Sequence, residues 1–176
     1  MRVLFLLIGE PHQGLHVLPI AAEMQSMGLA NIEVAIVNDE SDWTIELVRS
    51  AYPDFKPTVR KLSSPFCEAV QRWIPFRWTK SRILYLIRNL AYFRTFDAIV
   101  VPERTTTIIR HGLPSRSRLV FTPHGAGDRA ITFDPRDRFF DFVLVAGRKS
   151  EQRLLQARTI APGRYPVNGY VKMDFM

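Results

Sequence analysis

His124 and the small residues that follow it form the stretch of this sequence best suited to chemistry. Residues 118–128 read RLVFTPHGAGD, an apolar run followed by a proline, the histidine and two glycines. An imidazole titrates near neutral pH, so His124 is a candidate general base or phosphate contact. The backbone N–H groups of Gly125, Ala126 and Gly127 can face a phosphate or a developing oxyanion. An ordinary loop histidine beside turn glycines explains these residues equally well.

Two more histidines, His12 and His16, follow the first apolar run of the chain, residues 2–9. If that run and residues 118–122 are strands of one parallel sheet, the loops after them meet at the same edge, where such sheets bind ligands. We therefore expect His12, His16 and His124 to border one cleft. His16 is the second candidate for a catalytic residue, and His12 and Gly14 are candidates for substrate or phosphate binding.

Other kinds of site are not expected from the motifs. A zinc site needs further ligands at suitable spacing, and Cys67, the single cysteine, is remote from the histidines. The first turn, GEPHQG, matches neither the dinucleotide-binding fingerprint nor the P-loop. The sequence thus predicts no metal and no bound cofactor.

Strands and helices must alternate to position these loops. Helical patterns follow the first two apolar runs, and turn residues separate the elements. The fold class that this predicts is α/β, a Rossmann-like doubly wound parallel sheet of about six to seven strands. Strands are expected at 2–9, 31–38, 58–62, 97–101, 118–122, 140–146 and from 167 onward. The expected core of the sheet is Val3, Phe5, Leu7, Val34, Ile36, Ile99, Val101, Val120, Val143 and Val145.

Length, composition and charge narrow the class of protein. The chain has 176 residues, which is typical of one domain, and its 47% apolar content fits a globular protein. A single cysteine makes a cytoplasmic setting the simpler assumption, and the apolar start is too short to span a bilayer. The net charge of +7 favours an anionic partner.

A basic, aromatic segment lies between residues 69 and 96, which contain no acidic residue. Tryptophans flanked by cations suit a membrane interface, so the segment predicts peripheral association with the inner face of the plasma membrane. The residues expected to contact lipid are Trp73, Phe76, Arg77, Trp78, Lys80 and Arg82. A well-packed helix with incidental charge is an equal alternative, its core face formed by Ile83, Leu86, Ile87, Leu90 and Phe93, with Tyr85, Arg88 and Tyr92 on the far side. No recognition motif supports nucleic-acid binding.

Two stretches resemble a known family. Residues 9–22, GEPHQGLHVLPIAA, look like the first loop and helix of the N-terminal half of GT-B-fold transferases. The stretch HGAGDRAITFDPRDRFFDFVLVAGRKSEQRLL, followed by VNGYVKMDF, resembles the CDP-glycerol glycerophosphotransferases. That family commonly has W-H-G-T-P at the turn, whereas here Pro123 precedes the histidine. The UDP-N-acetylglucosamine 2-epimerases share the architecture but carry an acidic residue near the corresponding histidine.

The resemblance implies a two-domain enzyme of which this chain is the acceptor-side half. Residues 1–168 would form the Rossmann-like domain and 169–176 would begin the linker, with the C-terminal donor domain absent and this fragment alone inactive. The implied reaction moves a glycosyl or glycerophosphoryl group from a nucleotide-activated donor to a hydroxyl acceptor, in cell-envelope polysaccharide synthesis. The acceptors that this reaction allows include a lipid-linked one. A UDP-sugar epimerase and a non-catalytic domain that binds an anion or a partner protein are the alternatives.

Overall fold

The structure is a computed structural model of the whole chain. It describes residues 1–37, 39–62, 78–123, 134–169 and 171, with the backbone alone for 78–81. A six-stranded sheet forms its centre, with the strand order β3-β2-β1-β4-β5-β6 and every pair parallel. This confirms the predicted fold class, and the order is that of a doubly wound dinucleotide-binding sheet.

The strands coincide with the apolar runs of the sequence, although several are shorter than predicted. The predicted seventh strand is reduced to a single parallel bridge between Val145 and Val167. The strands are β1 (Arg2–Leu7), β2 (Asn31–Ile36), β3 (Thr58–Lys61), β4 (Ala98–Val101), β5 (Arg118–Phe121) and β6 (Phe142–Val143).

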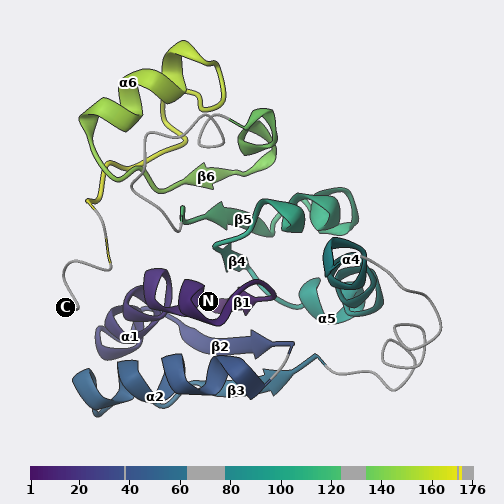
Figure 1. Ribbon diagram of the computed structural model, residues 1–176, viewed down its shortest axis with the longest axis vertical. Helices are drawn as coiled ribbons and strands as arrows, with labels where there is room; N and C mark the ends of the chain where they lie inside the picture. Colours follow the sequence, from purple (N-terminus) through teal and green to yellow (C-terminus); the bar gives the residue numbers. More distant parts are fainter. Residues whose placement is uncertain (38, 63–77, 124–133, 170, 172–176) are drawn as a thin grey trace.

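The helices follow the strands in sequence. Figure 1 shows α1 and α2 next to each other along β2 and β3, α4 and α5 grouped together, and α6 beyond β6. The α-helices are α1 (Leu18–Ser26), α2 (Asp42–Ala51), α4 (Trp78–Arg88), α5 (Leu90–Phe93) and α6 (Arg148–Gln156). The 3-10 helices are η1 (Pro11–His16), η2 (Asp39–Ser41), η3 (Arg104–Gly112) and η5 (Pro135–Phe139).

Both faces of the sheet are covered, which explains why β1 is apolar from Val3 to Leu7. Leu4 and Leu6 pack on the face that includes Phe93 and Leu154, whereas Val3 and Phe5 pack with α1 and α2 on the other face. The predicted core is buried apart from Val120, which is only partly buried.

The prediction for the helix before β4 was partly wrong. α4 ends at Arg88 and α5 begins at Leu90, so the helical periodicity does not continue across Asn89. Tyr85, expected on the far side, is buried, and Ile87, expected in the core, is 59% exposed. Leu86 and Phe93 are fully buried, as predicted. Among the described residues no helix is both long and apolar enough to cross a membrane.

Candidate functional site

The carboxyl edge of the sheet is where the loops after β1 and β4 meet. These strands are neighbours although α1, β2, α2 and β3 separate them in sequence, so a crevice opens at this switch point. Gly9 lies in the loop after β1, where a side chain would require Gln13 and Glu103 to move. A Cβ on Gly9 would lie 2.0 Å from Gln13 Oε1 and 2.5 Å from Glu103 Oε1.

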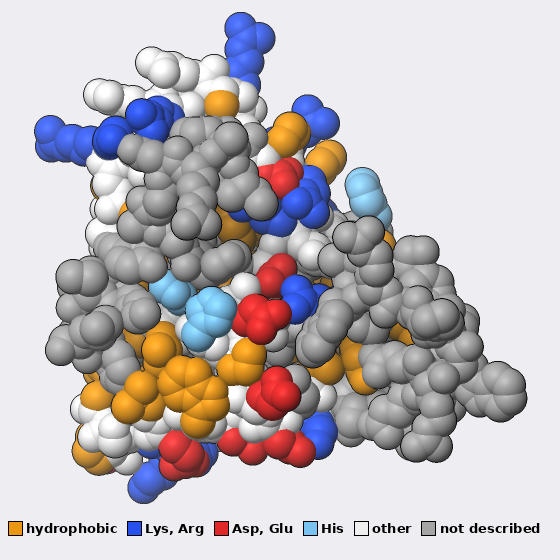
Figure 2. Space-filling view, viewed as in Figure 1, with side chains coloured by type: hydrophobic (Ala, Val, Ile, Leu, Met, Phe, Trp, Pro, Cys, Tyr) orange, Lys and Arg blue, Asp and Glu red, His pale blue; other side chains and the backbone are white. Residues whose placement is uncertain are grey.

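A polar cluster occupies this switch point. Glu103, directly after β4, accepts hydrogen bonds at Oε1 from Gln13 Nε2 at 2.8 Å and from Arg82 Nη1 at 3.3 Å. Arg82 also donates through Nη2 to Glu10 Oε1 at 3.3 Å. We call Glu10, Gln13, Arg82 and Glu103 the switch-point cluster. Figure 2 shows acidic, basic and histidine side chains gathered in the middle of this face, between grey regions.

The charge and the burial of the switch-point cluster both bear on what it can bind. Arg82 and Glu103 are each 14% exposed, so their ion pair is largely withdrawn from water. Gln13 is buried, and its Oε1 has no hydrogen-bond partner among the described residues. A buried acceptor without a partner is uncommon in folded proteins. A carboxylate held by an arginine and an amide can orient a hydroxyl group and accept its proton.

His16 lies further along the same edge, towards β5. It is buried and borders a small cavity together with Thr122 and Pro123 at the end of β5, and with Asn168 and Gly169. The cavity volume is about 10 Å³, which is room for one water molecule at most. The structure therefore places His16 beside the end of β5, in a space too small for a substrate.

The predicted site residues divide into those that the structure describes and those that it does not. His124, Gly125, Ala126 and Gly127 lie outside the described residues, so the predicted three-histidine cleft stays a prediction. His12 is exposed in η1. Gly14 is buried against α2, where a Cβ would lie 2.6 Å from Thr44 Oγ1. The missing side chain of Gly14 thus serves helix packing, and phosphate binding at Gly14 is untested.

Most of the predicted membrane contacts lie outside the residues whose side chains the structure describes. Trp73, Phe76 and Arg77 lie outside the described residues, and only the backbone of Trp78 and Lys80 is described, in the first turn of α4. Arg82 does not serve as an exposed lipid contact, because its guanidinium is directed to Glu10 and Glu103 in the switch-point cluster.

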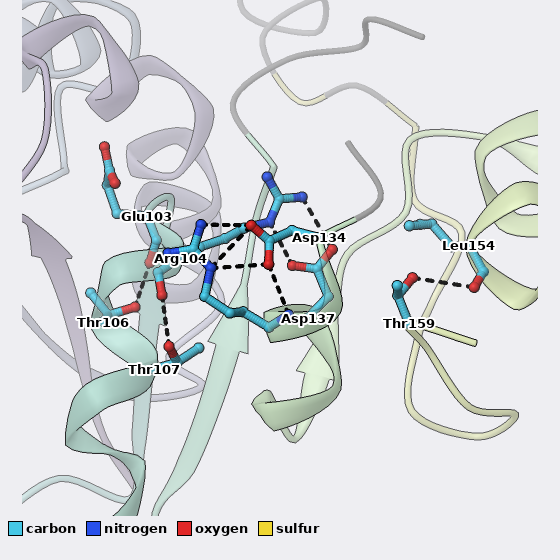
Figure 3. A network of polar contacts seen from close by, with 9 residues as sticks. Glu103, Arg104, Thr106, Thr107, Asp134, Asp137, Leu154 and Thr159 are labelled. Carbon is cyan, nitrogen blue, oxygen red and sulfur yellow. Dashed lines mark hydrogen bonds and ion pairs between the residues drawn. The ribbon is translucent and has the colours of Figure 1, made fainter. Parts of the chain in front are cut away.

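A second polar network lies behind the cluster, between η3 and η5. Arg104 Nε and Nη2 donate to Asp137 Oδ1 and Oδ2 at 2.6 and 3.1 Å, and the Asp137 side chain is 1% exposed. Burial raises the pKa of the Asp137 carboxyl above its ordinary value, and the hydrogen bond from Arg104 opposes this shift. Figure 3 shows the Glu103 carboxylate pointing away from this network. Arg104 and Asp137 thus hold η5 against η3, while Glu103 faces the crevice.

Gln13 and Glu103 are the functional candidates that the sequence prediction missed. Glu103 follows a buried strand after Pro102, so an acidic residue at a strand's carboxyl end was the available signal. Its contacts could not be read from spacing, because Gln13 is 90 positions and Arg82 is 21 positions away in the sequence.

Comparison with solved structures supports the fold. A putative UDP-N-acetylglucosamine 2-epimerase from Listeria monocytogenes has a TM-score of 0.67 at 12% identity, over 99% of this chain and 46% of that one. Anabaena Alr3699/HepE in complex with UDP and glucose has a TM-score of 0.61 at 15% identity, over 97% of this chain and 44% of that one. This chain therefore spans less than half the length of either structure. No protein-family model and no curated protein matches the sequence.

Proposed function

We propose that this chain is the acceptor-side half of a two-domain enzyme that acts on a nucleotide-activated donor. The observation that carries the proposal is the switch-point cluster, a buried carboxylate, amide and guanidinium at the edge where such sheets bind ligands. The two structural neighbours support it, since one is named a UDP-N-acetylglucosamine 2-epimerase and the other is described with UDP and glucose. A second domain, beginning after residues 169–176, would hold the donor.

The reaction we propose is transfer of a glycosyl or glycerophosphoryl group to a hydroxyl acceptor. The acceptor oxygen forms the new bond, the nucleotide leaves, and the acceptor proton passes to a base. Glu103 and His124 are the two candidates for this base, and the amides of Gly125–Gly127 would offset charge on the phosphate. The resemblance to CDP-glycerol glycerophosphotransferases points to cell-envelope polysaccharide synthesis. An acceptor presented at an anionic membrane, through segment 73–80, stays a prediction from sequence.

The pH dependence of turnover in the complete protein identifies the base. A histidine base places the acidic limb of the pH–rate profile near neutral pH, whereas a carboxylate base places it at distinctly lower pH. Replacing the base, by Glu103→Gln or His124→Ala, lowers turnover by about two to four orders of magnitude. Glu23→Gln, an exposed position in α1, is the control and leaves turnover unchanged. Full turnover in both site variants would remove the switch-point cluster and His124 from the mechanism.

A UDP-sugar 2-epimerase is the second candidate, and the acidic Glu103 at the switch point is the observation that favours it. The two reactions differ in their need for an acceptor. An epimerase converts UDP-N-acetylglucosamine with no hydroxyl acceptor present, whereas a transferase consumes its donor only when an acceptor is added. A protein that converts no nucleotide-activated donor under either condition would instead be a non-catalytic binding domain.

A further inference from the structure

A pocket lined by arginines lies beside β6, at the end of the strand order opposite to β3. It is formed by the end of η5, the start of β6 and the loop after α6, and its volume is about 130 Å³. That is roughly ten times the space that one water molecule needs. The loop residues precede the segment in which Arg164 and Pro166 accept hydrogen bonds from Val143 and Val145. The pocket therefore lies between β6 with the preceding η5 and the segment that follows α6.

The pocket carries an excess of positive charge. Arg138, Arg158 and Arg164 line it, and all three are exposed. None of them forms an ion pair with an acidic residue in the part of the chain that the structure describes. Asp137 is the acidic residue among the pocket's lining, and Arg104 already binds both of its carboxylate oxygens. Three arginines thus line a pocket whose single carboxylate is already bound by Arg104, a contact that Figure 3 shows.

The backbone of Arg158 provides an independent observation. Arg158 has a φ of 55°, and no other non-glycine residue among those described has a positive φ. It occupies the position just after the end of α6, where its N–H donates to Leu155 O and Thr159 N donates to Leu154 O, each at 3.0 Å. Glycine is the usual residue there, because a Cβ disfavours the left-handed conformation.

The end of α1 supplies a comparison within the same molecule. There the chain forms the same pair of hydrogen bonds, from Gly28 to Gln25 O and from Leu29 to Met24 O, and the residue is a glycine with a φ of 65°. The two helix ends share one geometry, yet α6 carries an arginine in the disfavoured conformation. Helix termination alone does not account for this arginine, whereas a role for its guanidinium in the pocket does.

We propose that this arginine pocket binds a phosphate monoester group. Guanidinium forks match the oxygens of a phosphate in paired hydrogen bonds, and three of them suit its two negative charges better than the single charge of a carboxylate. The phosphate belongs either to a soluble phosphorylated molecule or to a lipid headgroup. The pocket shares no residue with the switch-point cluster, so the proposal does not rest on the chemistry proposed there.

Calorimetric titration of the protein with inorganic phosphate tests the proposal. We expect saturable binding that Arg158→Gly weakens by about tenfold or more, as expected for loss of a charge-assisted hydrogen bond. The same variant should raise the thermal unfolding midpoint, since glycine tolerates the backbone conformation. A purely structural arginine would not combine weaker binding with higher stability. Arg164→Ala should also weaken binding.

Arg148→Ala is the matched control, because it removes the same charge from an exposed position at the other end of α6. It should leave the phosphate affinity unchanged. Equal loss of affinity in Arg148→Ala and Arg158→Gly would overturn the proposal, as would wild-type affinity in Arg158→Gly or acetate binding as tightly as phosphate. Glycerol phosphate and phosphatidic acid vesicles then distinguish the source. Tighter binding of the soluble compound assigns a soluble ligand, and tighter binding of vesicles that Arg158→Gly removes assigns a lipid.

Discussion

Replacing Arg104 by methionine should destabilise the fold by an amount that depends on pH. The substitution keeps an unbranched side chain but removes the partner of Asp137, whose side chain is 1% exposed. Among the described residues no other donor is hydrogen-bonded to the Asp137 carboxylate. The buried group must then stay charged without compensation or take up a proton, and each route costs stability.

The cost of protonation sets the size of the effect. The ordinary pKa of the Asp137 carboxyl is 3.8, and holding the proton at a higher pH costs about 1.36 kcal/mol per pH unit. The free energy of unfolding should therefore fall by at most about 4 kcal/mol at pH 7 and about 2 kcal/mol at pH 5. Loss of the contact between the Arg104 guanidinium and the Phe121 ring, 4.8 Å away, adds about 0.5–1 kcal/mol at both pH values.

Urea unfolding of both proteins at pH 5 and pH 7 measures this difference. A folded-state pKa raised above the unfolded value reduces stability as pH rises, so the variant should lose more at pH 7 than at pH 5. Arg104→Met combined with Asp137→Leu removes the charge and should abolish the pH dependence. An equal loss at both pH values in Arg104→Met would refute the reasoning, because the carboxylate would then not be the group left uncompensated.

Two further substitutions test the packing. Leu86 is fully buried, whereas Ile87 is 59% exposed. Leu86→Ala should therefore lower the free energy of unfolding by about 2–5 kcal/mol, and Ile87→Ala should change it by less than about 0.5 kcal/mol. Similar losses for the two variants in urea unfolding would contradict the observed break after α4. Gly9→Ala should lower the free energy of unfolding by about 1–3 kcal/mol, because its methyl group displaces Gln13 and Glu103. Gly147→Ala is the control, because its methyl group meets open space at an extended φ of 173°. Equal thermal midpoints of the two variants would show that the switch-point cluster adjusts freely.

The centre of the sheet could be predicted from sequence because its strands are buried on both faces. β1 is the clearest case, since Leu4 and Leu6 face one layer and Val3 and Phe5 the other, which leaves no polar position after Arg2. The lengths of the edge strand β6 and of the predicted strand at Val167 were overestimated. An apolar run shows that a segment tends to be buried, but it does not show the length over which a partner strand pairs with it.

The region around α4 shows where local periodicity fails. A continuous helix through residues 83–93 places Ile87 with Leu86 in the core, but the chain changes direction at Asn89, whose φ and ψ are −96° and 12°. The Asn89 side chain donates to Tyr85 O, one of the carbonyl groups at the end of α4. Asparagine commonly makes such local bonds at helix ends. The break rotates α5 relative to α4, so the one-helix projection misplaced Tyr85 and Ile87.

The distribution of charge is a matter of tertiary structure that composition does not reveal. A net charge of +7 indicates an anionic partner but not where it binds. In the described residues, the switch-point cluster offsets Arg82 with two carboxylates, whereas Arg138, Arg158 and Arg164 in the pocket beside β6 have no such offset. The phosphate that we propose therefore suits the pocket beside β6 better than the switch-point cluster. The sequence predicted that Arg82 contacts a membrane. In the structure it instead forms ion pairs with Glu10 and Glu103 in the switch-point cluster.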